Sequence, residues 1–200
     1  MLKTIFSFLR RNHLGVIIFV FAILGFIASF TLSVDKLDIL RNPNQQLPCN
    51  INSYFNCGIV MRSKYAEVAG IPWSFLGVAG YPAVMLLGLI IIERKKMSLW
   101  LTWLTTLPAF CAFALSTYFM YVSAYLIGVF CPWCIVSAVS ATSIFFALIT
   151  HNLAENNYNL KPEKADFIAR KIKGGWSTPF VILWFILIAI VEYLPFWFDR

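Results

Sequence analysis

Five cysteines are the side chains of this sequence best suited to covalent chemistry, and four of them fall into two pairs. Cys49 and Cys57 are separated by seven residues, whereas Cys131 and Cys134 enclose two residues in a Cys-Pro-Trp-Cys motif. A cysteine thiolate can attack a disulfide, form one or bind a metal ion. The two pairs therefore indicate disulfide exchange, structural disulfides or a metal site.

The Cys-Pro-Trp-Cys motif has the spacing of a reactive dithiol at the start of a helix. Two intervening residues bring both sulfurs to the same face of the first turn. The N-terminus of a helix also stabilises a thiolate, so we expect a lowered pKa for the more exposed cysteine of the pair. Pro132 is compatible with this position, because N–H groups of the first turn have no partner within the helix.

Three other interpretations of the cysteines stay open on spacing alone. Both pairs can be static disulfides, the pairs can be unrelated, or four thiolates can bind zinc. The seven-residue spacing fits a structural zinc site poorly, since such modules are usually compact and polar, and we expect no metal ion. Cys111 is the odd thiol inside an apolar stretch, where we expect it to be buried as a small apolar side chain.

The elements that position these cysteines are predicted to be membrane helices. The chain of 200 residues is 60% apolar and 12% charged, with 19 Phe and 7 Trp, which is too apolar for a soluble core of this size. Five stretches approach the roughly 20 residues needed to cross a bilayer. They cover residues 14–34, 73–92, 101–127, 131–150 and 178–198. We therefore expect an all-α integral membrane protein.

The charged residues between these stretches predict the orientation in the membrane. The net charge of +7 does not come from one basic patch interleaved with aromatic residues, so nucleic-acid binding is not expected. If the chain crosses five times, most of its bases lie on the side of the N-terminus, and basic loops are retained in the cytoplasm. These bases are Lys3, Arg10, Arg11, Arg94, Lys95, Lys96, Lys161, Lys164, Arg170, Lys171 and Lys173. The N-terminus is therefore predicted to be cytoplasmic.

That orientation places an outer loop of residues 35–72 and the start of the fourth span on the same outer face. The compartment there is oxidising, so paired cysteines can persist as disulfides. All four paired cysteines then share one face, which favours redox exchange over the other interpretations. We expect a short helix over Ile59–Val68 in the outer loop, a polar cytoplasmic linker over residues 151–176, and the fifth span in residues 177–200.

The order of the motifs resembles the vitamin K epoxide reductase family, and its bacterial members most of all. In chain order these motifs are Cys49…Cys57, Ser63, Gly70-Ile71-Pro72, Gly77, Tyr81 and Cys131-Pro132-Trp133-Cys134. The resemblance covers about residues 10–150. DsbB-type quinone oxidoreductases do a similar job but carry the two cysteine motifs in the opposite order.

This resemblance implies a fold and a direction of electron flow. The first four spans, within residues 1–150, would form a transmembrane four-helix bundle around a quinone, with the fifth transmembrane helix at one side. A thioredoxin-like partner would deliver electrons to Cys49, and Cys57 would pass them to Cys131. Cys134 would then reduce ubiquinone or menaquinone. A mobile loop is expected, because Cys57 must reach either Cys49 or Cys131.

The resemblance also implies residues that line the quinone site. Ser63 matches a serine that hydrogen-bonds near the quinone, and Trp73 aligns with a quinone-contacting asparagine of the vertebrate enzymes. Trp133 is a further candidate, because it lies at the outer interface beside the cysteines. Ala138 stands where the vertebrate enzymes have a tyrosine implicated in vitamin K binding. These departures favour an ordinary quinone over vitamin K epoxide.

The sequence thus predicts a quinone-dependent thiol oxidoreductase in the bacterial inner membrane, with its active site on the periplasmic side. Its expected partner is a separate periplasmic DsbA-like thioredoxin-fold protein. The alternative is a non-catalytic membrane subunit with structurally stapled outer loops. Glu192 is the one acid well inside a span, and we expect it to reach the interface.

Overall fold

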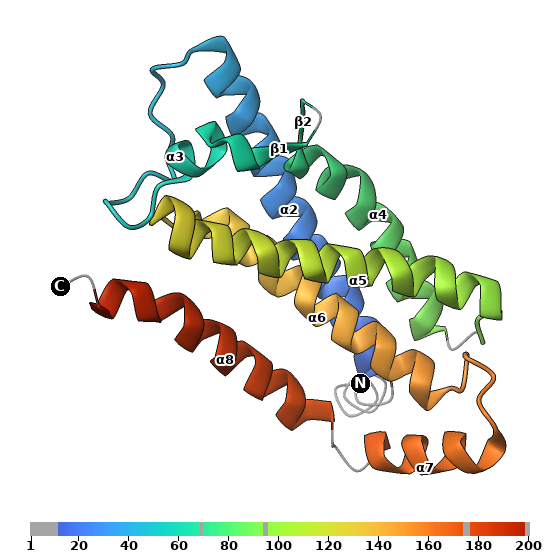
Figure 1. Cartoon of the computed structure of the whole chain (residues 1–200). Coiled ribbons are helices and arrows are strands. Elements are labelled where there is room, and N and C mark those ends of the chain that lie inside the picture. Colours follow the sequence, from blue (N-terminus) through green and yellow to red (C-terminus); the bar gives the residue numbers. More distant parts are fainter. Residues whose placement is uncertain (1–11, 69, 94–95, 174–176, 199–200) are drawn as a thin grey trace, which may run out of the picture.

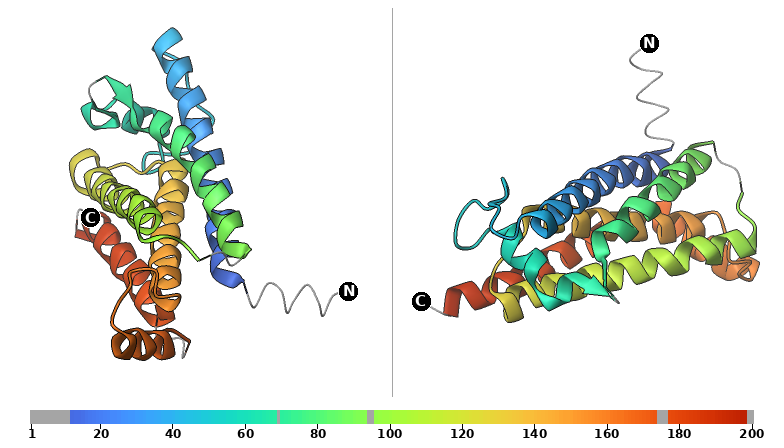
Figure 2. Two further views of the ribbon diagram at one scale, coloured as in Figure 1. Left: turned by 90° about the vertical axis from the view of Figure 1, so that its right-hand side faces the viewer. Right: turned by 90° about the horizontal axis from the view of Figure 1, so that it is seen from above.

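The computed structural model describes residues 12–68, 70–93, 96–173 and 177–198. In these residues, four helical segments are long and apolar enough to cross a membrane. They are α2 (His13–Arg41), α4 (Trp73–Ile92), α5 (Leu99–Tyr121) with its π-helical continuation Val122–Ile127, and α6 (Pro132–Ala154). Figures 1 and 2 show these helices side by side in one bundle. The prediction of an all-α membrane protein is confirmed.

Helices α2 and α4 approach each other closely at glycines. A Cβ atom on Gly25 of α2 would overlap the ring of Tyr81 in α4, and one on Gly88 of α4 would lie 3.0 Å from the backbone nitrogen of Phe19. Lipid is as apolar as the side chains, so packing between membrane helices depends on such small residues. The close approach fixes the position of Tyr81, whose side chain reaches from α4 to Ser137 of α6.

The buried core joins α2, α4 and α6. Ile18 of α2 and Leu148 of α6 are nearly inaccessible, and they pack with Leu87 and Ile91 of α4. Large apolar side chains elsewhere on the helices are exposed, such as Leu86 at 60%. Exposed apolar surface of this kind is expected where a bundle faces hydrocarbon.

The end of the bundle that carries residues 42–72 is called the loop end here, and it lies opposite α7 in Figure 1. Helix α2 continues to Arg41, so the first residues of the predicted outer loop are helical. The predicted short helix is present in part as α3 (Cys57–Arg62). It begins two residues earlier than expected, because the Asn56 side chain caps its first turn, and it ends six residues earlier, since Glu67 and Val68 belong to a strand. A 3₁₀ turn at Lys64–Ala66 follows.

Two short antiparallel strands, β1 (Glu67–Val68) and β2 (Ile71–Pro72), complete this end and lead into α4. They pair Glu67 with Pro72 and Val68 with Ile71. Gly70 between them has a φ of 79°, a conformation that glycine adopts without strain. The strands form a tight connection between the loop and α4.

The C-terminal part of the chain contains two further helices, α7 (Pro162–Lys173) and α8 (Ser177–Phe198). Helix α7 lies in the segment predicted to be a linker, whose composition gave no sign of it. Helix α8 runs from the α7 end towards the loop end (Figure 1), and its Trp184 ring lies 5.3 Å from that of Phe113 in α5. That α8 spans the membrane stays a prediction, and the Glu192 side chain lies outside the described residues.

One prediction about the core was wrong. Cys111 was expected to be buried inside its helix bundle, but its side chain is exposed on α5. Apolar sequence in a membrane helix does not distinguish a side chain packed in protein from one facing lipid or an apolar cavity.

Candidate redox site

The cysteine site is built by pairing two segments that are far apart in the chain. The backbone N–H of Phe130 donates to the carbonyl of Tyr54 at 2.8 Å, and the N–H of Asn56 donates to the carbonyl of Phe130 at 2.9 Å. Phe55 and Phe130 form a parallel bridge. Because Cys57 follows this loop segment and Cys131 follows Phe130, the pairing brings the two cysteines together.

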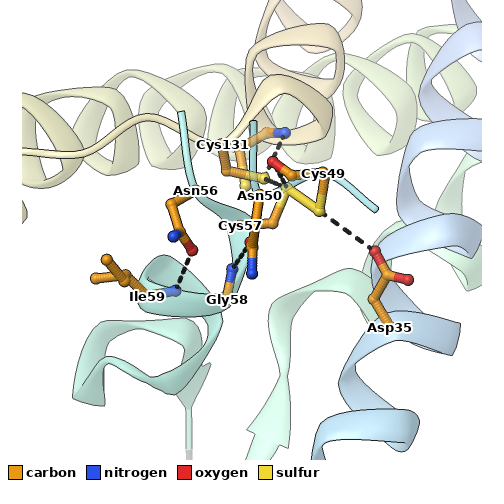
Figure 3. Close-up of a disulfide and its surroundings, with 9 residues drawn as sticks. Asp35, Cys49, Asn50, Asn56, Cys57, Gly58, Ile59 and Cys131 are labelled. Carbon is orange, nitrogen blue, oxygen red and sulfur yellow. Dashed lines mark hydrogen bonds between the residues drawn. A yellow bond between two sulfur atoms is a disulfide. The ribbon is translucent and has the colours of Figure 1, made fainter. Parts of the chain in front are cut away.

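Asparagine side chains hold the loop in this conformation. Asn52 Oδ1 accepts hydrogen bonds from the backbone of Tyr54 and Phe55, at 2.9 and 2.8 Å. Asn50 Oδ1 accepts from the N–H of Gly58 at 3.0 Å. Asn56 Oδ1 accepts from the N–H of Ile59 at 3.1 Å and caps α3. Figure 3 shows the Asn50 and Asn56 side chains near the sulfurs. The first turn of α3, and with it Cys57, is therefore fixed.

Three cysteine sulfurs lie in a row at the loop end. Cys49 and Cys57 are joined by a disulfide, with their Cα atoms 5.7 Å apart. The Cys131 sulfur lies 3.2 Å from the Cys57 sulfur (Figure 3). Cys57 and Cys131 are almost fully buried, at 0% and 1% exposure, and Cys49 is 7% exposed. The three pack with Leu32 and Met61 in one apolar cluster.

This geometry corrects the expectation that the loop must be mobile for Cys57 to reach both partners. Cys57 contacts Cys49 and Cys131 at the same time. In this arrangement, passage of Cys57 from one partner sulfur to the other needs no large movement of the loop.

Cys131 occupies the N-cap position of α6, as the spacing predicted. Its sulfur accepts from the N–H of Cys134 at 3.4 Å. A hydrogen bond from the Cys134 thiol, helped by the N–H groups of Cys134 and Trp133, lowers the pKa of Cys131, although burial opposes this effect. The lowered pKa thus belongs to the more buried cysteine of the pair and not, as expected, to the more exposed one. A lower pKa favours the thiolate, the form that attacks a disulfide.

Cys134 lies next to Cys131 and lines a cavity inside the bundle. The cavity has a volume of about 690 Å³ and is bounded mostly by apolar side chains of α2, α4, α5 and α6. Its size falls within the range of about 300–1,000 Å³ that is usual for small-molecule sites. Cys134 is therefore the cysteine placed to react with a molecule held in the cavity.

The residues predicted to line the quinone site divide between two places. Ser63 and Trp73 line the cavity, as does Ala138. The Ser63 hydroxyl donates to the carbonyl of Val60 at 2.7 Å. Trp133, by contrast, is not among the described residues that line the cavity, and it packs against the cysteine cluster.

Tyr81 connects the cavity wall to the cysteine helix. Its hydroxyl lies 3.1 Å from Ser137 Oγ and 3.2 Å from the Ser137 carbonyl, one turn after Cys134 in α6. Tyr81 belongs to the motifs that resemble the family, but the sequence alone did not predict this contact.

Two charged residues of α2 also reach the site, and the sequence reasoning missed both. Asp35 Oδ2 lies 3.7 Å from the Cys49 sulfur (Figure 3). Lys36, 7% exposed, lines the cavity. Charges at the end of a membrane helix usually reach the interface, so the sequence held no signal that singled out either residue.

Comparison with known protein families also indicates a membrane thiol oxidoreductase. The vitamin K epoxide reductase family matches the chain over residues 16–149, a range that includes most of α2 and α6, all of α4 and α5, and both cysteine pairs. The search of curated proteins gave no match. The family match covers more than half of the 200 residues and predicts a membrane thiol oxidoreductase of a generally quinone-linked class. The chain therefore belongs to the vitamin K epoxide reductase family.

Proposed function

We propose that this chain is a quinone-dependent thiol oxidoreductase that reoxidises a periplasmic DsbA-like thioredoxin-fold protein. The observation that carries the proposal is the 3.2 Å contact between the sulfurs of Cys57 and Cys131. A disulfide that only staples a loop does not require a free thiol against one of its sulfurs. This contact therefore favours a relay over the alternative of a non-catalytic subunit with stapled loops.

The relay begins at the loop disulfide. A partner thiolate attacks the Cys49 sulfur, and Cys57 leaves as a thiolate. Cys57 then attacks Cys131 in an oxidised Cys131–Cys134 pair, and Cys134 leaves. The second partner thiol releases Cys49, which attacks Cys57 and displaces Cys131. The partner has then lost two electrons and two protons, and Cys131 and Cys134 are a dithiol beside an intact loop disulfide.

That final arrangement of bonds is the one in the structure, with Cys49 joined to Cys57 and Cys131 and Cys134 free. The cavity beside Cys134 fits a quinone head group in size and in its apolar lining. A bound quinone supplies a two-electron acceptor for the dithiol. Ser63, Trp73 and Cys134 would lie against it, while Trp133 would support the cysteine cluster from outside.

The proposed location is the bacterial inner membrane, with the loop end in the periplasm. The bases expected on the N-terminal side support this orientation, since basic loops are retained in the cytoplasm. An oxidising compartment at the loop end also suits a disulfide between Cys49 and Cys57.

The proposal is tested with Cys134→Ala and a reduced thioredoxin-fold protein. We expect the wild-type protein to oxidise many equivalents of the partner when a short-chain ubiquinone is present. The variant should oxidise about one equivalent through its loop disulfide and then stop, because its electrons have no route to the quinone. Quenching with an alkylating mass tag measures both thiol pools.

The single turnover is the internal control, since it shows that the variant is folded and accepts the partner. Continued turnover of Cys134→Ala with quinone contradicts the mechanism. A wild-type protein that, without quinone, keeps its loop disulfide and leaves an excess of reduced partner unoxidised supports the stapled-subunit alternative instead.

A further inference from the structure

Lys36 is a buried cation in the wall of the cavity. It lies near the loop end of α2 and is 7% exposed. Its ammonium nitrogen donates to the carbonyl of Met61 at 2.8 Å and forms an ion pair with Glu67 Oε1 at 2.7 Å. The same residue lines the cavity together with Ser63 and Cys134.

The two partners do not exhaust the hydrogen-bonding capacity of this ammonium group. A lysine carries three N–H donors, and in the described part of the chain two are used, by Met61 and Glu67. Burying an ammonium group is costly even when it is paired. Apolar side chains could hold α2 against β1 at a lower cost in free energy. The charge of Lys36 therefore requires an explanation.

We propose that Lys36 binds the quinone through a hydrogen bond to one of its oxygens and stabilises negative charge there. This inference rests on the proposed function, since it assigns a ligand group within the same cavity. The redox balance does not involve the lysine: the Cys131 and Cys134 thiols pass two electrons and two protons to the quinone and form their disulfide. Lys36 acts by its charge and transfers no proton in this step.

Glu67 controls how much positive charge Lys36 presents to the quinone. Its carboxylate is 37% exposed at the rim and neutralises the ammonium in the resting site. Replacing it with glutamine removes the negative charge but keeps a side chain of the same shape. Lys36 would then present an uncompensated positive charge to the cavity. A ligand role therefore predicts opposite effects for changes at Lys36 and Glu67, whereas a mechanical clamp predicts the same effect for both.

The test measures binding without turnover, in the Cys134→Ala background. A short-chain ubiquinone is titrated against the purified protein in detergent, and equilibrium dialysis gives the dissociation constant. We expect Lys36→Met to weaken binding roughly tenfold or more, because a charge-assisted hydrogen bond is lost. Glu67→Gln should bind the quinone as tightly as the background protein or more tightly.

Lys64→Met is the matched control, because Lys64 is an exposed base whose ammonium lies over the Tyr65 ring. It removes the same charge from a position facing solvent and should leave the dissociation constant unchanged. Lys36→Arg keeps the charge and the donors and should restore binding to within about threefold. An intact Cys49–Cys57 disulfide, measured by mass tagging, establishes that each variant is folded.

The inference is overturned if Lys36→Met binds like Lys64→Met, or if Glu67→Gln loses affinity as much as Lys36→Met does. If Lys36→Met does not fold, the Glu67→Gln result decides alone, and a tenfold loss there contradicts the proposal. A failure of the proposed function looks different, because the protein with native Lys36 would then not bind the quinone at all.

Discussion

At the scale of single residues, the site separates the two sulfurs of the loop disulfide by their surroundings. Cys57 is enclosed and lies against Cys131, whereas Cys49 faces the carboxylate of Asp35 at 3.7 Å. A carboxylate there disfavours negative charge at Cys49 and repels an incoming thiolate. This difference agrees with the proposed relay, in which Cys57 is the leaving group and passes electrons to Cys131.

Asp35→Asn should make the loop disulfide easier to cleave. An anionic thiol such as glutathione should reduce it about fivefold faster at low salt, because a unit charge some 4 Å away contributes about 1 kcal/mol in water. Timed alkylation with a mass tag measures the rate. The effect should shrink as salt is added, since ions screen the carboxylate.

Asp38→Asn is the control for this prediction, because Asp38 lies on the same helix, α2, and its replacement removes the same charge. It should change the cleavage rate little. Equal rates in the two variants would show that Asp35 does not influence the chemistry of Cys49.

At the scale of elements, the cavity depends on how the helices are spaced. The π-helical segment Val122–Ile127 widens the end of α5 and contributes Val122, Ser123 and Ile127 to the cavity lining. Gly128 then turns the chain with a φ of 73°, which places Phe130 beside the loop. The irregular backbone of this region therefore helps to form the cavity and to position the cysteine sulfurs.

The contact between α2 and α4 should be sensitive to one methyl group. Gly25→Ala places a Cβ atom on the ring of Tyr81, which is held by Ser137, and should cost about 1–3 kcal/mol of stability. The loss should occur even though alanine is the better helix former. Thermal unfolding in detergent, followed by circular dichroism, measures the shift in melting temperature.

Gly80→Ala provides the matched comparison on α4. A Cβ atom at Gly80 meets no described atom within 4 Å, so the melting temperature should be unchanged or raised. A variant at Gly25 that melts at the same temperature as the one at Gly80 would show that the helices can separate there without cost.

At the scale of the whole molecule, the two ends of the bundle differ in chemistry. The loop end holds the cysteines and the polar amides, whereas the opposite end holds α7 and a buried network. In that network, Asn152 donates to Thr106 Oγ1 at 3.1 Å and accepts from Asn157 at 3.0 Å. The proposed orientation puts the oxidising chemistry in the periplasm and this network at the cytoplasmic side.

Labelling of introduced cysteines tests that orientation. Asn44→Cys, on the exposed loop, should react with a membrane-impermeant maleimide in spheroplasts. Lys161→Cys, in the connection before α7, should react only after the membrane is permeabilised. The wild-type protein gives the background from its own thiols. The reverse pattern of labelling would place the redox site in the cytoplasm.

The sequence by itself determined the membrane class, the first four helical spans and the four cysteines of interest. Each is a local property. A long apolar stretch predicts a membrane helix without information about its neighbours, and a Cys-x-x-Cys motif at a helix start places its two sulfurs by its spacing. The short loop helix was also predictable, although its start depended on the cap formed by Asn56. Local reasoning failed for Cys111, because apolar sequence does not say which way a membrane helix faces.

Only the tertiary structure decided how the cysteines meet. Cys57 and Cys131 are 74 residues apart, and they are joined by backbone pairing at Phe130 that leaves no trace in composition or periodicity. The same holds for Lys36 and Asp35, which look like ordinary flanking charges until α2 is placed against the loop. Contacts between distant segments depend on the packing of the whole bundle, so they emerge only when the helices are in place.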